Sequence, residues 1–490
     1  MTGGSIHPGG GVVVVGGGVA GLVVALDLAG AGHRAVLLEA AGSFGGVVSS
    51  HRVAGLTLDA GAESFATARP AVAELLAELG LAGRIAQPNP VGAWVRHAAG
   101  SAPLPATGFL GIPGHPFAAD VRRVIGLAGA ARCAADAVLP AGSGFPPGAT
   151  LGAIVRSRMG RRVLERLVEP VAGGVYAADP DQLEIDTVAP TLGAAVRQAG
   201  SLAGAVRGLR GGGERAGSAV ATLTGGLHTM VPSLVDAARD RGADLRTGAA
   251  VGGLVRDADG WRVELAGGER IAAAAVILAV PAPQAVGLLE TAAPGVRVSV
   301  LQAPITPVLI CTLVLDDRRL DGAPRGTGVL VSARVAGVRA KALTHATAKW
   351  PWLAEIAGPG RHVLRLSYGR GESGSAGLPA DDELPGVALA DAADLLGVTL
   401  APASVVDSAV VSWTSALPAP RPGHAAGVRD LRAALAASGL AVVGASVAGS
   451  GLAGVVHDAR LQAAELIRRL GAGSGGAPVS APSAREPTAG

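Results

Sequence analysis

Four consecutive valines lead directly into a glycine-rich turn near the start of this 490-residue chain, and few folds accept that order. The valines at 12–15 favour a buried β-strand, because β-branched side chains suit a pleated core. The next six residues read GGGVAG and match GxGxxG, and a helix rich in Ala and Leu is expected from about Gly21 to Gly32. A second apolar strand, 34–38, ends on Glu39. This order predicts a βαβ unit that binds a dinucleotide.

Each glycine of the motif has a separate task in such a unit. Gly16 allows the tight turn, Gly18 lets the backbone approach a pyrophosphate, and Gly21 lets the helix pack closely on the strand. The helix N-terminus offers unpaired N–H groups to phosphates. Glu39 follows Gly21 by 18 residues, where a carboxylate can accept hydrogen bonds from ribose hydroxyls. The alternative, a purely structural turn, explains the strand and helix but not the acid.

Later glycines favour FAD over NAD. Gly45 and Gly46 form a second pair, after which a strand-like LTLDAGAESF occupies 56–65. Far downstream, 440–454 reads LAVVGASVAGSGLAG, and its last six residues again satisfy GxGxxG. No further strand ending in an acid follows, so we expect this segment to return to the first domain and close over the same cofactor. Two distant segments around one long cofactor suit FAD.

Composition excludes several classes of function. The 41 basic and 38 acidic residues nearly balance, without a basic run, so nucleic-acid binding is not expected. Cys133 and Cys311 form no CxxC pair, and the histidines lack zinc spacing, so neither a disulfide framework nor a metal site is expected. The apolar run 271–289 is broken by two prolines, which argues against a membrane span. We therefore expect a soluble, cytoplasmic protein.

Taken together, these motifs resemble the flavin amine-oxidase superfamily. Within it, the chain is similar to the oxygen-dependent protoporphyrinogen and coproporphyrinogen III oxidases of haem synthesis. The resemblance covers about 12–470. Its supporting segments, beyond those above, are LVEPVAGGVYAADPDQL at 167–183, TGGLHTMVPSLV at 224–235, AVILAVPAP at 275–283, GTGVLVSA at 326–333, KWPWL at 349–353, LRLSYGR at 364–370, and Trp413 through Gly423-His424.

The resemblance implies noncovalent FAD and a set of site residues. The pyrophosphate is expected on the turn and the adenosine ribose on Glu39, with Arg69 and Tyr176 in the substrate pocket. An arginine suits a propionate carboxylate, although a solvated Arg at a helix start and a core Tyr are equally open. Trp413 is expected beside the flavin, with ordinary core packing as its alternative. The implied cofactor contacts are Gly16, Gly17, Gly18, Val19, Ala20, Gly21, Glu39, Gly45, Gly46, Gly61, Ala62, Glu63, Ser64, Val251, Trp413, Ser450, Gly451 and Leu452.

The implied reaction removes six hydrogens from coproporphyrinogen III in three two-electron steps, with hydride transfer to flavin and reoxidation by oxygen to hydrogen peroxide. Protoporphyrinogen IX is the alternative substrate. An amine oxidase, a carotenoid desaturase and a catalytically inactive FAD-binding relative also stay open. The sequence departs from the family pattern at Ser43, 418–422 and 453–454, and whether these departures impair catalytic activity is left open by the sequence. Contact with a membrane surface and docking to later haem-pathway enzymes are left open by the sequence.

The expected architecture is α/β, with a Rossmann-like FAD-binding domain made of 12–88, 222–290 and 404–470. A mostly helical insertion is expected over 89–221, a sheet-based substrate-binding region over 291–403, and a disordered tail over 471–490. Within the insertion, the Gly/Arg-rich stretch 200–218 is interpreted as a mobile loop.

Overall fold

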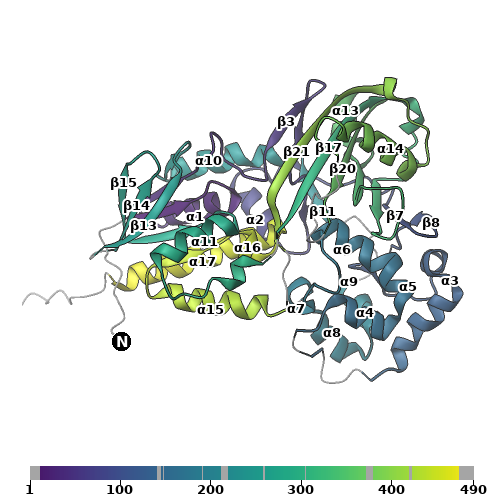
Figure 1. Cartoon of the computed structure of the whole chain (residues 1–490), viewed down its shortest axis with the longest axis horizontal. Helices are drawn as coiled ribbons and strands as arrows, with labels where there is room; N and C mark the ends of the chain where they lie inside the picture. Colours follow the sequence, from purple (N-terminus) through teal and green to yellow (C-terminus); the bar gives the residue numbers. More distant parts are fainter. Residues whose placement is uncertain are drawn as a thin grey trace, which may run out of the picture.

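The computed structural model describes residues 11–106, 108–140, 145–146, 148–189, 191–210, 219–257, 260–303, 305–370, 379–418 and 422–473. Two large sheets, several smaller ones and a group of helices make up the described part of the molecule (Figure 1). The first sheet is parallel and has the strand order β12-β2-β1-β16-β22. Its strands are β1 (Val12–Val15), β2 (Ala35–Leu38), β12 (Asp244–Arg246), β16 (Ala275–Leu278) and β22 (Leu440–Val442).

Both faces of this parallel sheet are covered, as an all-parallel sheet requires. Val12 and Val14 point into one core, whereas Val13 and Val15 point into another, because successive side chains of a strand alternate between its faces. The first core is closed by α1 (Val19–Gly30), α2 (Ala71–Glu78), α10 (Met230–Asp240) and α17 (Leu452–Gly473). The second is closed by α11 (Ala282–Ala292), α15 (His424–Ala436) and the antiparallel sheet of β13 (Val251–Asp257), β14 (Gly260–Leu265) and β15 (Arg270–Ala273).

The second large sheet has seven strands in the order β21-β17-β20-β19-β18-β7-β8, antiparallel except for the β18–β7 pair. Helix α14 (Leu384–Leu396) packs on one face. The strands are β7 (Trp94–His97), β8 (Gly100–Pro103), β17 (Ile305–Asp316), β18 (Gly328–Val331), β19 (Ala342–His345), β20 (Arg361–Tyr368) and β21 (Val405–Pro418). By sequence we placed 404–413 with the FAD-binding parts, but β21 pairs with β17 along most of its length.

Most other helices gather in one lobe beside the seven-stranded sheet, at the lower right of Figure 1. They are α3 (Ala119–Ala134), α4 (Leu151–Met159), α5 (Arg161–Val163), a π-helical turn at Leu164–Val168, α6 (Glu169–Tyr176), α7 (Ile185–Val188), α8 (Leu192–Ala199) and α9 (Leu202–Arg210). They share an apolar core that also takes in Val95 of β7.

The expected mobile loop at 200–218 is wrong where the structure describes it, because 202–210 form helix α9. Leu202, Ala203 and Val206 are buried at helical spacing in the core of this lobe. The backbone N–H of Ala203, at the start of the helix, donates to the buried Asp136 carboxylate (2.9 Å). Apolar periodicity therefore outweighs the Gly/Arg composition in this segment. Residues 211–218 lie outside the described part of the chain. So do 474–490 of the expected tail, whereas 471–473 complete α17.

Candidate functional site

The glycine turn between β1 and α1 leaves no room for side chains at two positions. Gly16 has a φ of 108°, and a Cβ there would stand 2.5 Å from the carbonyl oxygen of Ala279. A Cβ on Gly21 would stand 1.9 Å from the Gly16 carbonyl oxygen. Gly16 and Gly21 therefore pack the strand, the turn and the helix against one another, as the motif predicts.

Gly18 differs from both, because no described atom lies within 4 Å of the position a Cβ would take. It precedes the first residue of α1, where backbone N–H groups of the first helical turn have no partner inside the helix. A Cβ on Gly46 would stand 3.4 Å from the Gly18 Cα. The Gly45 N–H donates to the Gly17 carbonyl (2.8 Å). The glycine turn at Gly16–Gly18 and the Gly45–Gly46 pair thus meet around open space at the N-terminus of α1, and such a place fits a pyrophosphate.

Glu39 reaches back from the end of β2 to the same turn. Its carboxylate accepts hydrogen bonds from the backbone N–H of Gly17 (2.6 Å) and of Ala41 (2.7 Å), and the side chain is half-buried. A carboxylate has about four acceptor positions, so room remains for ribose hydroxyls. The Glu39 carbonyl accepts from the Ala249 N–H (2.8 Å), which brings Val251 at the start of β13 to this side of the turn.

The 59–64 segment, which follows β4 (Leu56–Asp59), lies next to the second glycine pair. The Ala62 N–H donates to the Val47 carbonyl (2.9 Å), and a Cβ on Gly61 would stand 2.2 Å from the same oxygen. Trp413 of β21 donates its indole N–H to the Ala60 carbonyl (3.2 Å). Trp413 is therefore half-buried beside the loop, at the position where the resemblance expects the flavin.

Glu63 of this segment accepts hydrogen bonds from two cations of the seven-stranded sheet region. Lys349 Nζ lies 2.7 Å from Glu63 Oε1, and Arg365 of β20 contacts the other oxygen. Burial alone would raise the pKa of Glu63, but Lys349 and Arg365 lower it to about 2. Glu63 is thus a largely buried, ionised carboxylate. No role was predicted from the sequence for Lys349 or Arg365.

Asp59, at the start of the loop, is held by the 224–230 segment. Its carboxylate accepts from the backbone N–H groups of Leu227 (3.0 Å) and His228 (2.8 Å), and lies 2.8 Å from His228 Nδ1. Sequence reasoning also missed this pair, although both residues lie in segments that carried the resemblance.

The C-terminal segment returns to the parallel sheet. β22 joins the parallel sheet beside β16, and Ser450 and Gly451 lead into α17 at Leu452. Gly451 is exposed, and no described atom lies within 4 Å of its ideal Cβ. A helix N-terminus with free space beside it therefore faces outward from this segment as well.

The two expected substrate residues, Arg69 and Tyr176, come from separate segments, and Tyr176 packs against the core of the helical lobe. The Arg69 guanidinium lies 3.9 Å from where a Cβ on Gly454, in the first turn of α17, would stand. Burial raises the pKa of Tyr176, at the end of α6, and the charge of Arg69 acts in the opposite direction. Arg69 is exposed and Tyr176 half-buried, so both can be reached from solvent.

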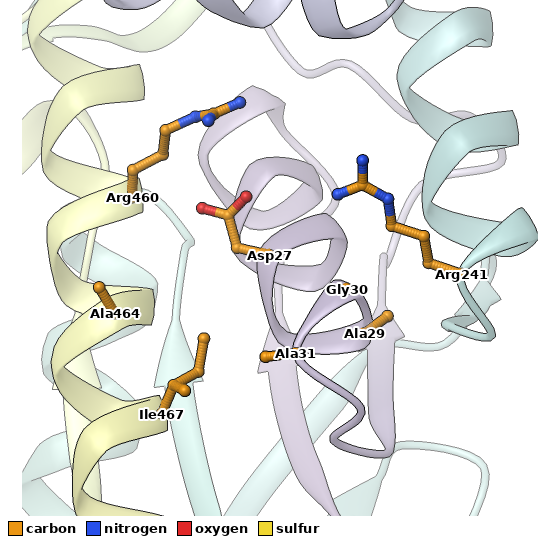
Figure 2. Close-up of a pocket in the computed structure, with 8 residues that line it drawn as sticks. All are labelled: Asp27, Ala29, Gly30, Ala31, Arg241, Arg460, Ala464 and Ile467. Carbon is orange, nitrogen blue, oxygen red and sulfur yellow. The ribbon is translucent and has the colours of Figure 1, made fainter.

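A separate groove of about 850 Å³ lies between α1, α10 and α17, away from the glycine turn (Figure 2). The Asp27 carboxylate lies between the side chains of Arg460 and Arg241 there, and both arginines pair with Glu78. Burial, with a smaller contribution from Glu78, raises the pKa of Asp27 to about 6 against the opposing effect of the arginines. This groove contains none of the predicted site residues.

The described residues contain neither a candidate metal site nor a candidate membrane-spanning helix. Within the described ranges, no group of three or more His, Cys, Asp or Glu side chains is arranged to hold a metal ion. No helix in the described part of the chain is long and apolar enough to cross a membrane.

The glycine turn and the seven-stranded sheet thus lie on either side of one shared loop, the 59–64 segment. The chain belongs to the flavin containing amine oxidoreductase family, whose model matches residues 19–467. It is a flavin-dependent oxidoreductase, as the resemblance implied.

Similar proteins span nearly the whole chain. The coproporphyrinogen III oxidase of Mycobacterium leprae (strain TN) is 34% identical over 429 residues, which cover 86% of this chain and 90% of that protein. The coproporphyrinogen III oxidase of Mycobacterium tuberculosis (strain ATCC 25618 / H37Rv) is 32% identical over 463 residues, covering 94% and 98%.

Solved structures agree on the fold. The crystal structure of a "Putative protoporphyrinogen oxidase" from Exiguobacterium sp. 255-15 superposes with a TM-score of 0.81 at 26% identity, covering 94% of this chain and 99% of that one. Cyclohexylamine oxidase from Brevibacterium oxydans IH-35A has a TM-score of 0.68 at 16% identity, with 94% and 99% covered, and supports the fold alone.

Proposed function

We propose that this flavoenzyme oxidises coproporphyrinogen III to coproporphyrin III in haem biosynthesis, with noncovalent FAD, oxygen as acceptor and hydrogen peroxide as second product. The observation that carries the proposal is the pair of mycobacterial relatives, both named coproporphyrinogen III oxidase and both matched over most of their length. Arg69, which is exposed and close to the first turn of α17, adds a cation that suits a propionate carboxylate.

The turn residues would hold FAD through its pyrophosphate at Gly18 and through its ribose at Glu39. When bound, the isoalloxazine ring supplies the hydride acceptor. The chain's residues orient the macrocycle: Arg69 offers a fork of donors that matches a propionate carboxylate, and Tyr176 offers an aromatic face at the pocket wall. Trp413 and the 59–64 loop would separate the reacting carbon from water on the sheet side.

The test is aerobic turnover of coproporphyrinogen III by the FAD-loaded protein, followed by porphyrin fluorescence and corrected for autoxidation. Arg69→Ala is expected to raise KM by roughly tenfold or more, since a charge-assisted hydrogen bond contributes about 1.5–3 kcal/mol. Arg69→Lys should recover part of the loss. Arg297→Ala, at an exposed arginine beyond α11, is the matched control.

Comparison with protoporphyrinogen IX then assigns the substrate. If protoporphyrinogen IX is turned over faster than coproporphyrinogen III, protoporphyrinogen IX is the substrate instead. A yellow protein with no enzyme-dependent fluorescence would contradict the catalytic proposal and favour the inactive FAD-binding relative.

We also propose a cytoplasmic location with peripheral membrane contact through the helical lobe. Cys133 and Cys311 are free and buried, which suits a reducing compartment. Phe117, Leu127 and Val138 of the lobe are exposed large apolar side chains, 57%, 67% and 83% accessible. Co-flotation with vesicles of mixed neutral and anionic lipid, weakened in Leu127→Ser, tests the contact, and recovery of the protein in the lipid-free fraction contradicts it.

A further inference from the structure

The buried ion network of Glu63, Lys349 and Arg365 joins three segments that lie far apart in the sequence. Lys349, at the end of α12 (Ala346–Lys349), bonds one carboxylate oxygen of Glu63 at 2.7 Å, and Arg365 bonds the other. The three side chains are 15%, 15% and 9% exposed. Two cations around one carboxylate leave one formal positive charge in a largely desolvated place, where charges act over longer distances than in water.

This charge lies directly against the loop that follows Asp59. Arg365 Nη2 donates to the Gly61 carbonyl (2.8 Å), so one guanidinium holds both the Glu63 side chain and the backbone two residues before it. The same loop connects to the glycine turn through the Ala62–Val47 and Gly45–Gly17 backbone hydrogen bonds. The loop would therefore lie beside a cofactor held at Gly18 and Glu39, on the far side of the Gly45–Gly46 pair.

The other charged and titratable groups near the network do not cancel it. Burial lowers the pKa of His51, Arg365 lowers it further, and the opposing effect of Asp59 is the smallest, so His51 is neutral. The Asp59 carboxylate is already bound by Leu227 and His228. Nε of Arg365 is buried and has no hydrogen-bond partner among the described residues.

We propose that this ion network sets the reduction potential of the bound flavin, with Lys349 and Arg365 raising it and Glu63 limiting the rise. The inference rests on the proposed function, because it needs flavin at this loop. In each oxidation step one bridging C–H bond of the substrate would break and its electron pair and hydrogen would leave as hydride, while one further proton would leave to solvent, from a pyrrole N–H in two of the three steps and from another bridging C–H in the remaining one. The acceptor ring thus gains one negative charge, which nearby cations stabilise and a nearby carboxylate opposes.

The test is the midpoint potential of the FAD-loaded chain, measured by anaerobic equilibration with reference dyes. Glu63→Gln removes a negative charge and is expected to shift the potential upward. Lys349→Met removes a positive charge and is expected to shift it downward, whereas Lys349→Arg should leave it near wild type. The double variant, which restores the net charge, should lie between the single variants. A purely structural role cannot give shifts of opposite sign.

Asp316→Asn is the matched control. It also removes a carboxylate paired with an arginine of β20, Arg361, but at an exposed site. Its potential should equal that of wild type. Glu63→Gln leaves two buried cations without a counter-charge and can prevent folding. In that event the midpoint potentials of Lys349→Met and Lys349→Arg are compared. Equal potentials in those two variants overturn the proposal.

The failures of the two proposals are distinguishable. A folded wild-type chain that takes up no FAD overturns both the proposed function and this inference. Variants that retain FAD with unmoved potentials, or with shifts of the same sign, overturn only the role of the network.

Discussion

Gly21 and Gly16 touch so closely that a Cβ on Gly21 would stand 1.9 Å from the Gly16 carbonyl oxygen. Gly18, between them in the sequence, has an extended backbone (φ −68°, ψ 174°) that any residue adopts, and open space beside it. Two glycines of one motif therefore have different reasons to be glycine.

Substitution separates those reasons. Gly21→Ala is expected to destabilise the fold by about 3 kcal/mol, because strand and helix must move apart. Gly18→Val should keep the wild-type melting temperature of the cofactor-free protein but lose FAD, because its side chain fills the phosphate position. Thermal melts and flavin content per chain are the measurements, with Gly42→Ala as control in a neighbouring open loop. Full FAD content in Gly18→Val would contradict the proposed pyrophosphate position.

Asp27→Asn is expected to stabilise the protein at neutral pH. The folded-state pKa of Asp27 is about 6, above its ordinary 3.8, so the folded state favours the protonated form. Wild-type stability should therefore rise as pH falls from above 6 to below 4, and the asparagine variant should lack this dependence. We expect a gain on the order of 1 kcal/mol at pH 7.5, measured by chemical denaturation. A gain that persists unchanged at pH 3.5 would contradict this origin. The same change at exposed Asp240 is the control.

Asp136→Ala is expected to destabilise the helical lobe. The Asp136 carboxylate is fully buried, caps Ala203 of α9 and pairs with Arg158 (2.5 Å). Its loss leaves a nearly buried guanidinium without its counter-charge, which costs about 3 kcal/mol. Hydrogen exchange should speed up in α9 and not in α1. Unchanged protection of α9 would show that its packing alone maintains the helix.

Neither cysteine is expected to react with a thiol reagent in the folded state. Burial raises the pKa values of Cys133 and Cys311 to about 12, with Asp136 adding to the rise at Cys133, and the thiolate is the reactive form. Titration with a chromogenic disulfide should find no reactive thiol in native protein and two in denaturant. Rapid labelling of native protein would contradict the burial of one of them.

Local patterns predicted the parallel sheet well, because β1, α1, β2 and Glu39 follow one another and each carries its own signal. The antiparallel sheet was harder: β7, β8 and β21 join it by pairings that depend on distant residues. The ion network could not be predicted from local patterns either, because Lys349 and Arg365 lie 286 and 302 residues from Glu63 in the sequence. The chain has only two lysines in 490 residues, Lys341 and Lys349, and this scarcity is a usable signal for Lys349.

The parallel sheet takes its five strands from segments between Val12 and Val442, and strands of the seven-stranded sheet alternate with them along the chain. During synthesis, β1 and β16 therefore wait for β22, which is made after every strand of the seven-stranded sheet. The seven-stranded sheet has all its strands once β21 is made, whereas the parallel sheet still lacks β22. Chains interrupted before residue 440 should therefore lack one strand of the sheet that carries the glycine turn, and we expect proteases to clear them rather than let them accumulate as folded intermediates.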